Sequence, residues 1–94
     1  MGGGTSGRAS VPLTDARQVA LGRRVRDLRG RLGLTQQALA RRAGIHWTYL
    51  SGIERGERNP ALINIGRVAD ALEISLAELF SVFTQRPHTR RLRR

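Results

Sequence analysis

Three glycines divide the middle of the chain into short segments. Gly33, Gly44 and Gly56 each follow a stretch in which apolar residues recur with the spacing of a helix. A glycine in that place ends a helix by adopting the left-handed conformation. The segments between these glycines therefore form only short helices, joined by tight turns. This pattern predicts a compact all-α domain, in which the second and third helices form a helix-turn-helix pair around Gly44.

Capping residues mark where three of these helices begin. Thr14 or Asp15 can cap the first helix, and Thr35 precedes the sequence QQALARRA of the second. Ser75 and Glu78 form a capping box, in which each residue satisfies a backbone N–H of the other, at the start of the last helix. The beginnings of these helices are therefore predicted from local chemistry alone.

Apolar spacing predicts five helices and no strand. The third helix runs from residue 46 or 47 to 55, and the fourth from 61 to 72. ERNP, between them, is predicted as a loop because the residue before Pro60 resists the helical conformation. The residues expected to face the core are Leu21, Val25, Leu28, Leu32, Leu39, Ala40, Ala43, Leu50, Ile53, Leu62, Ile65, Val68, Ala69 and Leu72.

The charge of the chain points to a polyanionic partner. The 94 residues carry a net charge of +10, and all 17 basic residues are arginine. Arginine binds phosphate and base edges through a planar fork of donors. Five of the arginines lie in residues 84–94, which contain no acid. A merely solvated basic surface, or the base composition of a genome, would give a similar bias, so charge alone does not decide the partner.

Composition argues against an enzyme. His46 and His88 are the only histidines, and there is no cysteine. We find no Ser–His–acid set, glycine-rich phosphate loop or metal-ligand spacing, so no catalytic residue, cofactor or metal is predicted. The sequence also lacks an apolar run long enough for a membrane span, and we expect a cytoplasmic, nucleoid-associated protein without a membrane partner.

The third helix has two unlike faces. Leu50 and Ile53 must face the core, which leaves Trp47, Thr48 and Ser51 on the opposite side. Hydroxyl groups and an aromatic ring on a helix surface suit contacts to base edges in the major groove. Packing against a neighbouring helix is the alternative for the same residues.

The motifs LTQQALARRAG, YLSGIERGERNPAL and IGRVADALEISLAELF occur in this order. Together they resemble the Xre/Cro-type helix-turn-helix regulators over residues 18–83. The resemblance implies a lambda-repressor-like bundle of five helices that regulates transcription by binding double-stranded DNA at a near-palindromic operator. Within the family, the chain is most similar to the small controller proteins of restriction–modification systems. An antitoxin-type repressor, which binds a partner toxin as well as DNA, is the alternative.

The resemblance also implies roles for individual residues. Those matching base-facing positions are His46, Trp47, Thr48, Ser51 and Gly52, and Gly52 is expected where bulk would hinder approach to DNA. Those matching phosphate-contacting positions are Thr35, Gln36, Tyr49, Arg55, Arg58 and Asn59. Arg29 and Glu54 match a structural ion pair between the first and third helices. Trp47 departs from the controller pattern, which usually has a basic residue there, and this puts the operator sequence in doubt.

The family also implies a homodimer formed largely through the fifth helix. The apolar residues expected at this interface are Ile74, Leu76, Leu79, Phe80 and Phe83. The alternative is that they only fill the monomer core. No small-molecule effector is evident. We expect residues 1–14 to be a disordered arm, residues 15–83 the DNA-binding domain, and residues 84–94 a mobile basic tail.

Overall fold

The computed structural model describes residues 15–83. Their helices are α2 (Ala16–Arg31), α3 (Gln36–Ala43), α4 (Trp47–Glu54), α5 (Leu62–Ala71), α6 (Leu76–Leu79) and the 3-10 helix η1 (Phe80–Phe83). No strand occurs among these residues, and the predicted all-α fold of five helices is confirmed. The expected arm, 1–14, and tail, 84–94, lie outside the described residues.

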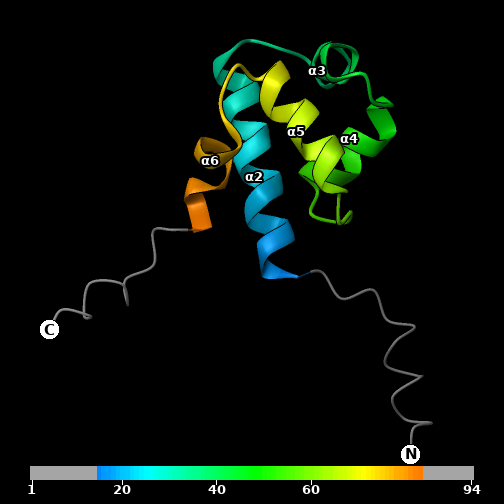
Figure 1. Cartoon of the computed structure of the whole chain (residues 1–94). Helices are drawn as coiled ribbons and strands as arrows, with labels where there is room; N and C mark the ends of the chain where they lie inside the picture. The colour runs from blue at the N-terminus through cyan, green and yellow to red at the C-terminus, as the bar shows by residue number, and fades with distance from the viewer. Residues whose placement is uncertain (1–14, 84–94) are drawn as a thin grey trace, which may run out of the picture.

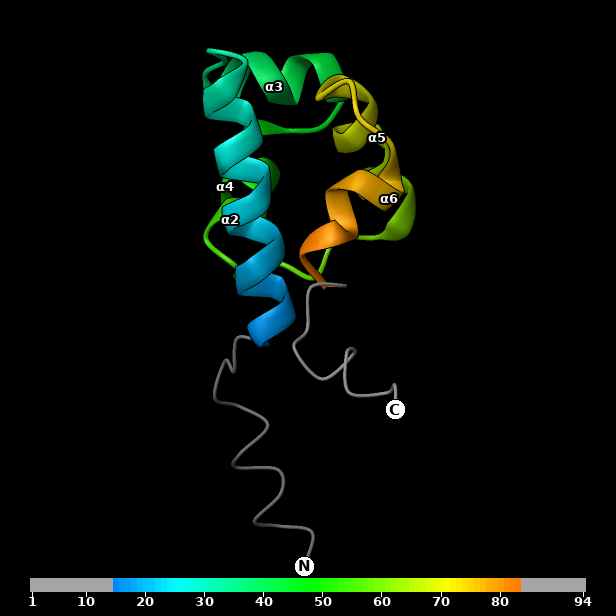
Figure 2. The ribbon, with the colours of Figure 1, turned by 90° about the vertical axis from the view of Figure 1, so that its left-hand side faces the viewer.

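The helices gather around α2, the longest of them (Figure 1). Helix α4 packs against one side of α2, and α6 with η1 packs against another. Helix α3 lies across the end of the bundle where α2 finishes, in contact with α4 and α5 (Figure 2). The largest fully buried side chains come from all five helices: Val25, Leu39, Leu50, Ile53, Val68 and Leu79.

The predicted helix starts are confirmed by their hydrogen bonds. The Asp15 carboxylate accepts from the N–H of Arg17 at 2.7 Å and forms a capping box with Gln18. Hydrogen bonds from the side chain and backbone of Arg17 hold the pKa of the Asp15 carboxyl below its ordinary value, so the cap is ionised at neutral pH. Ser75 and Glu78 form the expected capping box of α6.

The helix ends also follow the prediction, with one addition. Gly33, Gly44 and Gly56 all have positive φ, between 70° and 76°. Glu73 adopts the same left-handed conformation after α5, with φ of 65°. Residues other than glycine are strained in this conformation, and no glycine marks this position in the sequence.

Two apolar residues expected in the core are instead exposed. Leu62 is 67% exposed because it is the first residue of α5, at the end of the helix. Leu32 is 42% exposed because it is the C-cap of α2, where the chain leaves the helix. Ile63, beside Leu62, is 69% exposed. The start of α5 therefore presents an apolar pair to solvent.

Helix α2 approaches α4 closely at Gly22. A Cβ atom built on Gly22 would lie 2.3 Å from the carbonyl oxygen of Ile53 and 2.7 Å from that of Glu54. These distances are too short for any side chain. Gly22 therefore sets how deeply the C-terminal end of α4 sits against α2, which no local pattern in the sequence indicated.

Replacing Gly66 with alanine is expected to stabilise the domain by about 0.5–1 kcal/mol. Gly66 lies within α5, and a Cβ atom built there meets nothing within 4 Å. The alanine would reduce the entropy of the unfolded chain at no steric cost. Urea unfolding of the variant should show a higher midpoint at every protein concentration. A lower midpoint would contradict the open space that the structure has around Gly66.

Candidate nucleic-acid interface

Helices α3 and α4 form the predicted helix-turn-helix pair. Gly44 ends α3 in the left-handed conformation, and the N–H of Ile45 donates to the carbonyl of Ala40 at 3.0 Å. His46 then caps α4 through its imidazole. The turn is therefore only three residues long, which holds α4 at a fixed angle to α3.

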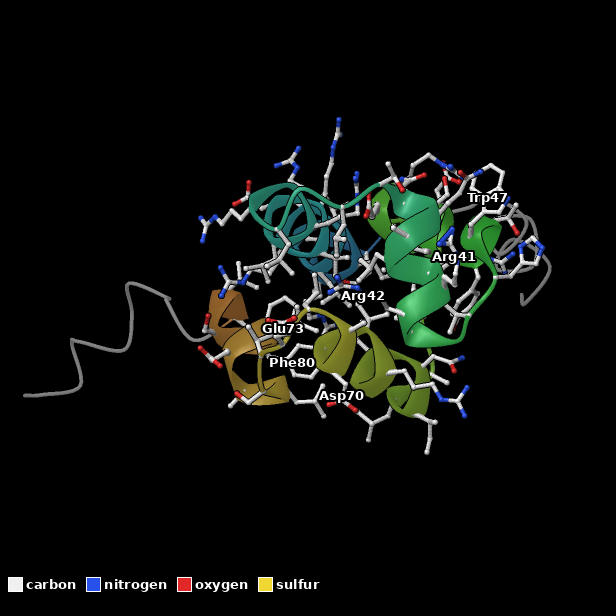
Figure 3. All side chains as sticks on the ribbon, turned by 90° about the horizontal axis from the view of Figure 1, so that it is seen from above. Arg41, Arg42, Trp47, Asp70, Glu73 and Phe80 are labelled. Carbon is white, nitrogen blue, oxygen red and sulfur yellow. The ribbon has the colours of Figure 1, made fainter. Side chains whose placement is uncertain are left out.

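The exposed part of α4 is its N-terminal turn. His46, Trp47 and Thr48 are all exposed, and 43% of Trp47 is accessible to solvent. In Figure 3, Trp47 stands at the upper right edge of the molecule, well away from Phe80. This placement agrees with the expectation that these three residues point away from the core.

The structure corrects the expected exposure of Ser51. Ser51 is only 7% exposed, and its hydroxyl accepts a hydrogen bond from the Arg55 guanidinium one turn later. A residue this buried has no surface for a base edge in the observed conformation. Ser51 therefore positions Arg55, because helix residues four apart lie on the same face.

Gly52 lies under the side chain of Arg58. A Cβ atom at Gly52 would lie 2.6 Å from Cγ of Arg58, so the Arg58 side chain covers this glycine. The same side chain continues over the Tyr49 ring, with Cζ of Arg58 5.5 Å from the ring centroid. The missing side chain at Gly52 thus makes room for Arg58, and Gly52 itself is buried.

Tyr49 links α4 to the start of α5. Its phenol oxygen lies 3.3 Å from the N–H of Ala61 and 3.3 Å from the side-chain amide of Asn64, and it accepts from both. The phenol hydrogen is not used in either bond, because a hydroxyl accepts through its lone pairs. It is therefore available to donate to an acceptor such as a phosphate oxygen.

The expected ion pair between Arg29 and Glu54 is present and buried. Arg29 Nε donates to Glu54 Oε2 at 2.6 Å and Nη2 donates to Oε1 at 3.0 Å, so the pair is bidentate. The side chains are 17% and 3% exposed. Arg29 also donates to the carbonyl of Leu34 at 2.8 Å. One guanidinium therefore joins α2, the following turn and α4.

Gln36 completes this network. Its amide nitrogen donates to Glu54 Oε1 at 2.9 Å, which ties the first turn of α3 to the end of α4. The amide nitrogen carries a second hydrogen, which no hydrogen bond within residues 15–83 uses. Thr35, the residue before it, caps α3 by accepting from the N–H of Ala38 at 3.0 Å.

The loop after α4 carries exposed cations. Arg55 forms an ion pair with Glu57 at 3.0 Å, and Arg58 and Asn59 are exposed beside it. Arg58 has no carboxylate partner among the ion pairs of residues 15–83. Arg58 thus places a positive charge over Tyr49 and Gly52 of α4.

The residues expected at a dimer interface fall into two groups. Leu79 is completely buried in the core, so it has no surface for a second chain, and its expected role is corrected to a core role. Ile74, Leu76, Phe80 and Phe83 are partly buried against that core. Phe80 and Phe83 also line a cavity of about 400 Å³ together with the exposed Leu62, which apolar spacing predicts to face the core.

Arg24 is a structural residue that sequence reasoning missed. Its Nη2 donates to the carbonyl of Glu78 at 3.0 Å and lies 3.4 Å from the hydroxyl of Ser81, which joins α2 to α6 and η1. Only tertiary structure brings these residues together, because they are more than fifty positions apart.

Residues 15–83 hold no group of His, Asp and Glu side chains that could bind a metal ion. Over the same range, none of the helices combines the length and the apolarity that crossing a bilayer requires.

Comparison with known proteins identifies the fold family. The Helix-turn-helix family model matches residues 25–79. An HTH-type transcriptional regulator of Sinorhizobium fredii is 42% identical over 60 residues, which cover 64% of this chain and 78% of that protein. Control protein C.BamHI of Bacillus amyloliquefaciens is 34% identical over 73 residues, 77% of this chain and 90% of that protein.

A solved structure agrees with these matches. The restriction–modification controller protein C.AhdI from Aeromonas hydrophila superposes with a TM-score of 0.68 at 45% identity, covering 69% of this chain and 98% of that chain. The resemblance stated from the motifs is therefore confirmed. The chain belongs to the helix-turn-helix family, and the proteins similar to it include transcriptional regulators and restriction–modification controllers.

Proposed function

We propose that the protein is a sequence-specific regulator of transcription that binds double-stranded DNA. The observation that carries this proposal is the placement of α4. The buried Arg29–Glu54–Gln36 network fixes its C-terminal end, and its N-terminal turn projects His46, Trp47 and Thr48 into solvent. A rigidly held helix with an exposed polar turn suits insertion into the major groove.

Two sets of residues have different roles at this surface. His46, Trp47 and Thr48 face base edges and specify sequence, whereas cations and donors around them hold phosphates and set register. The phosphate-binding residues in this proposal are Thr35, Gln36, Tyr49, Arg55, Arg58 and Asn59. The helix-turn-helix acts by occupying DNA rather than by catalysis, in the cytoplasm where DNA is available.

A homodimer completes the proposal. Leu62, Phe80 and Phe83 bring apolar surface together at one cavity, and Ile74 and Leu76 add partly exposed apolar side chains. A second copy would cover this surface and place two α4 helices about 34 Å apart, on successive major grooves. In this arrangement residues 15–83 form the DNA-binding domain and the arginines of 84–94 add contacts to flanking phosphates.

The relatives named controller proteins favour a role beside a restriction–modification system. The antitoxin-type alternative draws no support from them. Selection of bound sequences from random duplexes tests the function as a whole. We expect an enriched site with two inverted half-sites about one helical turn apart. Binding without enrichment of any sequence would overturn the proposal.

Trp47 should report on DNA binding through its fluorescence. Because 43% of this single tryptophan is exposed on α4, contact with the groove would remove water from the indole and shift its emission to shorter wavelength. Titration with the selected operator should therefore move the emission maximum, while a random duplex at high salt should not. An emission spectrum that saturating operator leaves unmoved would contradict contact between Trp47 and DNA.

Ser51 and Thr48 should differ in how their loss affects binding. Thr48→Ala should cost about 1–3 kcal/mol on the operator and little on random DNA, as expected for a residue that contacts a base. Ser51→Ala should weaken both by a similar factor, since the hydroxyl orients Arg55 and does not reach a base. Fluorescence anisotropy on the two duplexes measures this. A loss confined to the operator in Ser51→Ala would restore Ser51 as a base-reading residue.

A further inference from the structure

We infer that His46 determines which hydrogen-bonding groups Thr48 can recognise. The hydrogen of the Thr48 hydroxyl is held by His46, so that Thr48 offers DNA only an acceptor and selects an exocyclic amino group of adenine or cytosine. The inference rests on the proposed function and names a chemical specificity for one of its base-facing residues.

The geometry at the start of α4 fixes the state of the imidazole. His46 Nδ1 lies 3.2 Å from the backbone nitrogen of Thr48 and 2.7 Å from its Oγ1. A backbone N–H can only donate, so Nδ1 must be the acceptor and carries no hydrogen. In the neutral ring the single hydrogen is then on Nε2.

Because Nδ1 of His46 accepts, the Thr48 hydroxyl must be the donor in the bond between them. Oγ1 of Thr48 is 2.7 Å from a nitrogen that can only accept. A hydroxyl has one hydrogen and two lone pairs, and its hydrogen is used in this bond. Because Thr48 is exposed, the lone pairs remain open to a ligand while no hydrogen is left to donate.

The major groove offers few partners for such a group. The only hydrogen-bond donors on base edges there are the amino groups N6 of adenine and N4 of cytosine, whereas N7, O6 and O4 are acceptors. A free threonine hydroxyl can turn to suit either kind. The Thr48 hydroxyl cannot turn in this way while it is bound to His46. It therefore distinguishes base pairs by the position of an amino group.

The capping residue is what distinguishes α4 from its neighbours. Asp15, Thr35 and Ser75 cap α2, α3 and α6 through oxygen atoms, and α4 is capped by an imidazole nitrogen. A serine or threonine cap carries a hydrogen that it could donate to Thr48, which would free the Thr48 hydrogen. An unprotonated Nδ1 has none, so the polarity of Thr48 is fixed.

The test compares single functional groups of DNA in the selected operator. Each adenine is replaced by purine and each cytosine by a pyrimidinone, both of which lack the amino group, and each purine by a deazapurine that lacks N7. Dissociation constants are measured for the natural chain and for Thr48→Val, which has the same shape without the hydroxyl. We expect removal of one amino group to weaken the natural chain about tenfold and to leave Thr48→Val unchanged.

Two variants of the cap separate positioning by His46 from simple helix capping. His46→Asp provides a cap that only accepts, so the preference for the amino group should persist even though added negative charge lowers affinity overall. His46→Ser provides a cap with a hydrogen of its own. The ratio of the dissociation constants without and with the amino group should therefore fall toward one. Circular dichroism should show equal helix content in both, since aspartate and serine are good N-caps.

The outcomes separate this inference from the function on which it depends. If no sequence is enriched in the selection, the proposed function fails. If an operator is found but Thr48 couples to N7, or His46→Ser keeps the full preference, the function stands and the inference is wrong.

Discussion

Replacing Gly22 with alanine is expected to destabilise the domain by about 3 kcal/mol or more. The added Cβ would meet two backbone carbonyl oxygens, at 2.3 Å from Ile53 and 2.7 Å from Glu54. Neither oxygen is at the end of a flexible side chain, so α2 and α4 would have to separate. Native proteins have only about 5–15 kcal/mol of stability in total, so the variant should unfold at a much lower urea concentration.

Gly30 provides a matched control on the same helix. A Cβ atom at Gly30 meets nothing within 4 Å, so Gly30→Ala should leave the domain as stable as before or raise its stability by up to about 1 kcal/mol. Urea unfolding followed by circular dichroism measures both variants. Equal effects of the two substitutions would show that α2 does not approach α4 as closely as the structure has it.

Replacing Arg29 with methionine is expected to cost about 3–5 kcal/mol, because the Glu54 carboxylate would remain buried without its cation. Glu54 is 3% exposed and would keep only the amide of Gln36 as a hydrogen-bond donor. The carbonyl of Leu34 would also lose its partner. Since this network fixes α4, operator binding should fall more than stability alone explains, even under conditions where the variant is folded.

Arg31 offers the corresponding control. It pairs with Asp27 at 3.4 Å on the same helix, but the two side chains are 67% and 66% exposed. Exposed pairs of this kind contribute about 0–1 kcal/mol, so Arg31→Met should change stability little. A double variant, Arg29→Met with Glu54→Leu, should recover most of the loss. If Arg29→Met proved as mild as Arg31→Met, the pair would not be the structural link described above.

Several parts of the fold were predictable because their energies are local. Asp15, Thr35 and Ser75 cap helices through atoms within three residues of themselves. Gly44 ends α3 through its own backbone conformation. These features depend on neighbours in the sequence, so they could be recognised without knowing which helices meet. Glu73 was missed because its left-handed conformation is set by the return of the chain from α5 to α6, with no glycine to mark it.

The candidate site was predicted less completely. The pairing of Arg29 with Glu54 and the exposure of Trp47 and Thr48 agree with what the motifs implied. The burial of Ser51 does not, because the spacing of α4 places it on the outer face of an isolated helix. The partners that cover this face, Arg55 and Arg58, come from the end of α4 and the loop beyond it.

The sequence by itself determined the class of the molecule: its helices, their capped ends, the helix-turn-helix pair and the family. Tertiary structure alone decided which residues are buried and which are exposed to solvent. Leu79 is in the core, Leu62 is at the surface, and Gly22 lies against two carbonyls of α4. The physical reason is that periodicity gives the direction of a side chain on its own helix. Whether that direction ends in solvent or against another element depends on residues far away in the chain.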